Sequence, residues 1–176
     1  MEKISILYST DPNRELGMTN EEILAFYNEE HLHEDEELKT DIWARDVQDW
    51  LWYTLDDRFE AFRYNLKKDI KVLVVADIGR WDGRVPGGDV TTLDDAVRRI
   101  ISEEDYFEFY YDGDTIKACT ENHDGTSYYS LYKVTDEGFE WYDNDHSHTL
   151  QQEHEILLNN PKYTERLKPD DISCAW

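Results

Sequence analysis

The sequence predicts an α+β fold in which N-terminal helices are followed by a small, mostly antiparallel sheet with one or two packed helices. Two observations lead to this expectation. Apolar residues recur at a helical period as far as residue 66, and from residue 70 onward they form β-branched runs separated by turn dipeptides. We therefore expect a helical N-terminal segment over residues 1–69 and an α+β domain over residues 70–176, which together form one compact unit.

Two helices are predicted in the N-terminal segment. The stretch "TNEEILAFYNEEH" offers Thr19 or Asn20 as an N-cap, places acids in the first turn, and repeats its apolar residues at helical spacing. A second, longer helix is expected from Leu38 to Leu66, because its apolar residues form a single stripe. That stripe consists of Leu38, Ile42, Val47, Trp50, Leu51, Leu55, Phe59, Phe62 and Leu66.

The period changes after this stripe. "IKVLVVADI", over Ile70–Ile78, is almost continuously apolar and β-branched, which is typical of a strand covered on both faces. "TTLDDAVRRIIS" predicts a helix that Thr91 or Thr92 caps, with acids in its first turn and arginines near its end. The sheet should therefore have at least one helix packed against it.

The rest of the domain is predicted to be mainly antiparallel. "YFEFYYDGDTIKACTENHDGTSYYSLYKVT" alternates strand-like runs with turn signals at Asp112-Gly113 and Asp124-Gly125, which indicates a hairpin pair or a meander. A last helix is expected near Gln151–Leu158, ending before Pro161.

The net negative charge of the chain limits the kinds of molecule that it can bind. The chain has 176 residues and a net charge of -23 from 41 acids and 18 bases, yet 14% of its residues are aromatic, enough for a real core. Such a protein repels nucleic acid and anionic membranes, so we expect no tight direct nucleic-acid binding, no membrane association and a basic protein partner. Solubility, or a high-salt habitat, is the simpler explanation of the charge. The oligomeric state is left open.

Compartment follows from the cysteines and from the lack of a leader. Cys119 and Cys174 are far apart and have no metal or redox spacing. The first residues lack the apolar run of a signal peptide, and no stretch approaches about 18 consecutive apolar residues. We expect a soluble protein of a reducing compartment, the cytoplasm.

The loop within "VVADIGRWDGRVPGGDV" resembles a phosphate cradle, because glycines follow a strand and precede a helix. It lacks the spacing of either phosphate-binding glycine motif, and its aspartates would repel a phosphate. A structural turn is the favoured interpretation. Gly79 and Gly83 permit unusual backbone angles, Trp81 anchors the turn on the core, and Arg80 or Arg84 pairs with a neighbouring acid.

Histidines raise the possibility of a metal-assisted hydrolase. His146 and His148, with His154, Asp143 and Asp145 nearby, could ligate one ion, and a similar pair stands at residues 31 and 33. An H-x-H pair alone is a weak signal, and we expect no metal and no cofactor.

His123, Asp124 and Ser127 could form part of a catalytic triad, but no strained nucleophile turn accompanies them. A hairpin is favoured there.

Clustered carboxylates are the stronger functional signal. Acids three or four residues apart on a helix lie about 5–6 Å from one another, close to the phosphate repeat of roughly 6–7 Å along a nucleic-acid strand. Such a surface could occupy a channel of lysines and arginines built for nucleic acid. The predicted partner-binding residues are Glu34, Asp35, Glu36, Glu37, Glu103, Glu104, Asp105, Glu108 and Asp112, with Tyr110 or Tyr111 as apolar contacts nearby.

Two motifs carry a resemblance. Gly79, Trp81, Gly83 and Arg84 in "IGRWDGR", and His123, Asp124, Gly125 and Thr126 in "NHDGTS", are similar to motifs of a family of small proteins from phages and mobile elements of Firmicutes. The resemblance covers residues 70–140, and Arg80, Asp82, Asn122 and Ser127 depart from it. It implies a non-enzymatic anti-CRISPR or anti-restriction inhibitor of a host nuclease, most directly a type II CRISPR effector. An acidic antitoxin or regulator that neutralises a basic toxin is the alternative.

Overall fold

A seven-stranded sheet and the helices around it make up the part of the chain that this computed structural model describes, namely residues 5–67, 69–78, 90–113, 115–136, 158–168 and 171. The strand order is β1-β4-β5-β6-β2-β3, with β7 beside the end of β6, and all the pairs are antiparallel. The predicted α+β class with a mostly antiparallel sheet is confirmed. The strands are β1 (Ser5–Ser9), β2 (Lys71–Ile78), β3 (Val90–Thr92), β4 (Tyr106–Asp112), β5 (Thr115–Asn122), β6 (Gly125–Val134) and β7 (Thr164–Arg166), and the helices are α1 (Pro12–Leu16), α2 (Asn20–His31), α3 (Arg45–Tyr64) and α4 (Leu93–Ile101).

The predicted meander forms the middle of the sheet. β4 pairs with β5 and β5 with β6, through turns at the two expected places. Gly113 in the first turn has a φ of 64°, a left-handed angle that an L side chain rarely adopts. In the second turn Asn122 faces Gly125, and the Asn122 Oδ1 accepts the Asp124 N–H at 2.8 Å. The two residues of that loop are therefore His123 and Asp124, with the glycine at the start of β6.

β2 is covered on both faces, as its sequence predicts. Val72 and Val74 point into the main core, and Leu73 between them packs with Val134 in a smaller cluster on the other face. Val72, Leu73 and Val74 are all fully buried. Alternating residues of a strand point to opposite faces, so three consecutive buried residues require cover on both sides.

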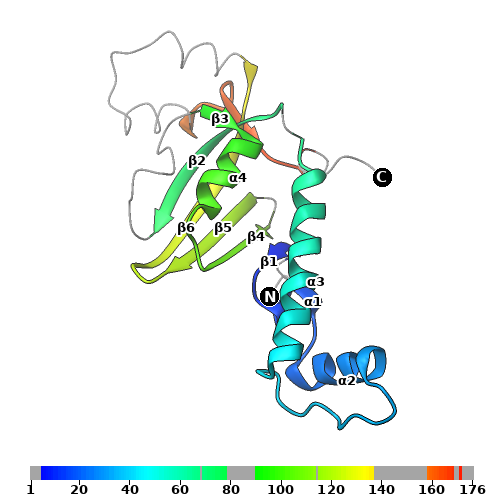
Figure 1. The fold of residues 1–176 in the computed structure, drawn as a ribbon. Coiled ribbons are helices and arrows are strands. Elements are labelled where there is room, and N and C mark those ends of the chain that lie inside the picture. Colours follow the sequence, from blue (N-terminus) through cyan, green and yellow to red (C-terminus); the bar gives the residue numbers. More distant parts are fainter. Residues whose placement is uncertain are drawn as a thin grey trace.

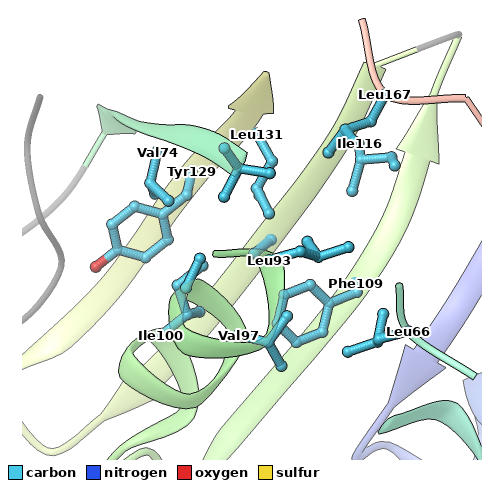
Figure 2. Packing of buried hydrophobic residues seen from close by; sticks show 13 residues of the cluster. Leu66, Val74, Leu93, Val97, Ile100, Phe109, Ile116, Tyr129, Leu131 and Leu167 are labelled. Atoms are coloured by element: carbon cyan, nitrogen blue, oxygen red, sulfur yellow. The ribbon is translucent and has the colours of Figure 1, made fainter. Parts of the chain in front are cut away.

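α4 packs on one face of the sheet and builds the main core. Its Leu93, Val97 and Ile100 point toward Phe109, Ile116, Tyr129 and Leu131 of the strands (Figure 2). Thr92 is the N-cap, with its Oγ1 accepting the Asp95 N–H at 3.2 Å. The predicted helix is confirmed.

The first element is a strand, which the sequence did not lead us to expect. β1 pairs with β4 at the sheet edge, about a hundred residues away in sequence. Tyr8 of β1 stacks among Phe59, Phe62 and Phe107, with ring centroids 4.8 to 5.9 Å apart. A five-residue strand has too few positions to show a period, and β1 owes its conformation to these distant partners.

α2 starts where its cap predicts, and α3 starts later than expected. Thr19 and Glu22 form a capping box at the start of α2. α3 begins at Arg45 instead of Leu38, and Leu38 is 68% exposed. Asp41 prevents an earlier start, because its carboxylate accepts the Trp43 N–H at 2.9 Å and so stabilises a turn in place of a helix.

The second half of α3 lies along the β1 side of the sheet, whereas α2 and the start of α3 extend beyond the sheet (Figure 1). Glu15 of α1 connects β1 to the second half of α3. Its carboxylate accepts from the Ser9 N–H at 2.8 Å and from the Arg58 Nε at 2.7 Å. Ile23, Val47 and Leu51 form a small core of their own between α2 and α3.

Strands β3 and β7 were not predicted, and each is only three residues long. The helix predicted near residues 151–158 falls almost entirely outside the described residues. Among the helices of the described ranges, none combines the length and the apolar character needed to cross a membrane.

Candidate protein-binding surface

Residues 20–60, from the start of α2 to the last turn of α3, concentrate exposed negative charge. We call this segment the helical arm. It contains 14 acids and three basic residues, and all 14 acids are exposed. Their side chains stand on α2, on the loop at residues 32–44 and on α3. The helical arm is thus an acidic surface that starts beside the sheet, where Phe59 packs on Phe107, and continues beyond it through the start of α3 and α2 (Figure 1).

The same arm exposes large aromatic side chains. Trp43 is 76% exposed, Trp52 62% and Tyr53 64%, and the rings of Trp52 and Tyr53 meet edge to face at 5.0 Å. Single exposed apolar residues are common on proteins, but tryptophans and tyrosines gathered on one segment are typical of interaction surfaces.

Trp43 and Trp52 line a cavity of about 360 Å³. The β1–α1 junction, the start of α2, the loop before α3 and the middle of α3 all contribute to its wall. Its apolar lining comes from Pro12, Ile23, Ile42, Trp43, Leu51, Trp52 and Leu55, and its polar lining from Thr10, Asp11, Asn13, Asn20 and Gln48. A lining in which apolar side chains predominate and several polar groups are interspersed is typical of a binding pocket.

Hydrogen bonds hold the loop that carries Trp43. The Asn28 side chain donates to the Lys39 carbonyl at 2.9 Å and accepts the Lys39 N–H at 2.8 Å, which ties the loop to α2. The Gln48 side chain donates to the Ile42 carbonyl at 2.7 Å, which ties it to α3. Trp43 therefore stands on a segment fixed at both ends, and less conformational entropy is lost when it meets a partner.

Carboxylates flank the exposed ring of Trp52 along α3. Asp49 precedes it by three residues and Asp56 follows it by four, and both are exposed. Residues at these spacings are neighbours on a helix surface. A group placed over this indole would therefore meet negative charge on both sides.

The predicted acids do not form a single face. Glu34, Asp35, Glu36 and Glu37 are exposed, but they lie in the loop between α2 and α3 instead of on a helix. Glu103, Glu104 and Asp105 connect α4 to β4, and Asp112 is at the other end of β4. The length of the strand separates Asp105 and Asp112 by about 20 Å.

Glu108 is the clearest departure from the prediction, because it is only 4% exposed. Its Oε1 accepts from Arg14 Nη1 at 2.7 Å, and its Oε2 accepts from the Tyr106 hydroxyl at 2.8 Å. Burial, followed by the hydrogen bond to Glu108, raises the pKa of Tyr106 to about 12. Glu108 thus joins α1 to β4 and cannot belong to an exposed electrostatic face.

Tyr110 and Tyr111 are also poor contact residues. Both are half-buried, and burial is the first cause that raises the pKa of Tyr110 to about 12. They lie on β4, which is not part of the helical arm.

The motif residues are divided between described and undescribed parts of the chain. His123 and Asp124 are exposed in the β5–β6 turn with the His123 Nε2 3.3 Å from an Asp124 oxygen, and Gly125 and Thr126 begin β6. Gly79, Trp81, Gly83 and Arg84 lie outside the described residues, as do the possible ligands Asp143, Asp145, His146, His148 and His154. Within the described ranges, no three metal-ligating side chains gather.

Cys119 is buried next to Glu108 in the sheet register. Burial, and then the charge of Glu108, raises the pKa of its thiol. A protonated, covered thiol is a poor nucleophile.

Sequence reasoning missed Trp43, Trp52 and Tyr53. The signal was present, because all three fall outside the apolar stripe that predicts α3. Large aromatic residues off the buried stripe of a helix have to be either covered by another element or exposed, and here they are exposed.

Comparison of the chain with protein-family models, with curated proteins and with solved structures gives no match.

Proposed function

We propose that this protein is a non-enzymatic inhibitor that binds the basic, nucleic-acid-binding surface of a host defence nuclease. The observation that carries the proposal is the combination of 14 exposed acids with exposed tryptophans on one extended arm. Acids alone would serve solubility, and exposed aromatics alone would reduce it. Both together favour a partner whose surface is basic and carries apolar contact points.

Charge supports a basic partner over other classes. A net charge of -23 repels nucleic acid, anionic membranes and a second copy of the chain. The acids of α2 and α3 stand one helical turn apart, as Asp46 and Asp49 do, and as Asp56 and Glu60 do. Their separation of about 5–6 Å approaches the phosphate repeat that a nucleic-acid channel accommodates.

The kind of partner comes from the motif resemblance, which implies inhibition of a type II CRISPR effector or a restriction nuclease. The simplest mechanism is that the protein competes with DNA for the lysines and arginines of the nuclease. It requires an acidic surface of suitable spacing and no reacting group.

The test uses a guide-loaded type II CRISPR effector nuclease and two matched variants. In the arm variant, Glu34, Glu36 and Glu37 become Gln and Asp35 becomes Asn. In the sheet-end variant, Asp105, Asp112 and Asp124 become Asn and Glu121 becomes Gln. All eight positions are exposed, and both variants remove four charges.

We expect the parent protein to slow DNA cleavage and the arm variant to bind the nuclease about ten-fold more weakly. Its association should be slower and less dependent on salt, because steering by the acidic arm is reduced. The sheet-end variant should keep most of the affinity. Equal losses in the two variants would mean that only net charge matters, and no inhibition of cleavage by the parent protein would remove the nuclease as the target.

A further inference from the structure

We propose that the cavity between Trp43 and Trp52 receives an arginine side chain from the basic partner. This inference rests on the proposed function and names the chemistry of one contact within it. The cavity offers an apolar wall, two exposed indole rings and nearby carboxylates, and an arginine side chain is the protein group that matches all three.

The lining suits the aliphatic part of such a side chain. Ile23 and Leu51 form the inner wall, and both are buried in the small core between α2 and α3. Ile42 and Leu55 add to the apolar lining. A long basic side chain can cover this surface with its methylene groups while its charged end stays near water.

The rim suits the guanidinium. Trp43 and Trp52 present rings on which a planar cation can stack, and arginine does so more readily than lysine. Asp11 lines the cavity from the β1–α1 junction. Asp49 and Asp56 stand one turn before and one turn after Trp52, outside the cavity lining, and the Asp49 carboxylate lies 3.9 Å from the Arg45 Nε. A guanidinium in the cavity would therefore meet an indole ring and the Asp11 carboxylate, with further negative charge beyond Trp52.

Other occupants fit less well. An apolar side chain would take water away from the Asp11 carboxylate in the cavity wall without bringing a cation to it. An anion would be repelled by the same carboxylate. A second copy of this chain carries the same charge of -23, which opposes self-association through so acidic a surface.

The experiment follows the indole N–H signals of the six tryptophans by NMR while peptides are added to the full chain. The probes are a short peptide of alternating arginine and glycine, its lysine counterpart, and the lysine peptide with a central leucine. Trp52→Leu and Trp43→Leu test the cavity. Tyr64→Leu is the matched control, because Tyr64 is a large aromatic residue on the same helix, 82% exposed and outside the cavity lining.

We expect the arginine peptide to shift the Trp43 and Trp52 signals and to bind about two- to five-fold more tightly than the lysine peptide. Trp52→Leu and Trp43→Leu should each reduce that preference, and Tyr64→Leu should preserve it. Equal binding of the arginine and lysine peptides with unmoved indole signals would overturn the arginine site and leave the basic-partner function standing. Tighter binding of the leucine peptide at the same indoles would overturn it in favour of an apolar contact. If no basic peptide binds at all, the proposed function fails as well.

Discussion

At the scale of single residues, position in the sheet decides what a carboxylate does. Glu108 and Asp112 stand on the same strand four residues apart, and the sequence marks both as members of an acidic cluster. Glu108 is buried against Arg14 and Tyr106, whereas Asp112 is exposed at the strand end, 3.7 Å from the Lys117 Nζ. The first is a structural group, and only the second is available to a partner.

Glu108→Gln should lower the free energy of unfolding by about 1–3 kcal/mol. The carboxylate accepts hydrogen bonds at both oxygens, so an amide in its place points an NH₂ group at either Arg14 or Tyr106. Urea unfolding measures the loss. Asp112→Asn is the control and should stay within about 0.5 kcal/mol of the parent. A Glu108→Gln variant as stable as this control would show that the buried network contributes little.

Three tyrosines should make the fold sensitive to alkali. The pKa values of Tyr8, Tyr106 and Tyr110 are raised from 10.0 to about 12, in each case first by burial. The folded state therefore favours the neutral phenols, and the stability that this contributes is complete below pH 10 and is lost as pH rises toward about 12.

Tyrosinate absorbance and circular dichroism, followed together against pH, check this prediction. A group of tyrosines should ionise late and in step with loss of the fold, whereas in urea all 12 should titrate near their ordinary value. If every tyrosine of the folded protein ionised near pH 10 while the circular dichroism stayed native, Tyr8, Tyr106 and Tyr110 would not be buried as described, and the prediction would be wrong.

At the scale of elements, the loop at residues 32–44 links the fold to the candidate protein-binding surface. It is rich in acids, carries Trp43, and is held to α2 by both polar atoms of the Asn28 side chain. Asp41 then turns the chain before α3 begins at Arg45. The cavity beside Trp43 and Trp52 depends on these local bonds as much as on the small core beneath it.

Asn28→Ala should release this loop without unfolding the sheet. Two part-buried hydrogen bonds are removed, which should cost about 1–2 kcal/mol and should speed amide exchange over residues 32–44. Hydrogen exchange read by mass spectrometry gives the measurement. Glu29→Ala, an exposed neighbour on the same helix, is the control and should leave exchange unchanged. Unchanged protection of the loop in Asn28→Ala would mean that other contacts hold it.

At the scale of the whole molecule, charge is distributed over a folded surface. The acids extend from the helical arm to the ends of the sheet strands, and the aromatic residues lie both in the cores and on the arm. The field of such a molecule should draw it toward basic surfaces and away from polyanions.

The isolated protein should therefore not bind duplex DNA with submicromolar affinity at physiological salt. It has few cations with which to release the counterions of DNA. Fluorescence anisotropy with labelled duplex DNA tests this expectation, and a basic DNA-binding domain serves as the positive control. Tight binding that weakens as salt increases would contradict the proposal that the protein competes with nucleic acid.

Features that depend on neighbouring residues could be predicted along the chain. These are the capped helices α2 and α4, the doubly covered strand β2, the β4–β5–β6 meander with its two turns, and the acidic surface. Period, capping and turn chemistry act over a few residues, so their signals can be read along the chain.

Features that depend on distant partners became visible in the folded structure alone. β1 exists because β4 pairs with it, Glu108 is buried because Arg14 and Ser9 cover it, and Trp43 and Trp52 line one cavity because α2 and α3 pack together. Whether an acid or an aromatic residue is covered depends on what packs over it, and that neighbour can stand anywhere in the chain. For this reason the acids at residues 34–37 could be proposed from the sequence, whereas the exposed Trp43 and Trp52 beside them and the burial of Glu108 could not.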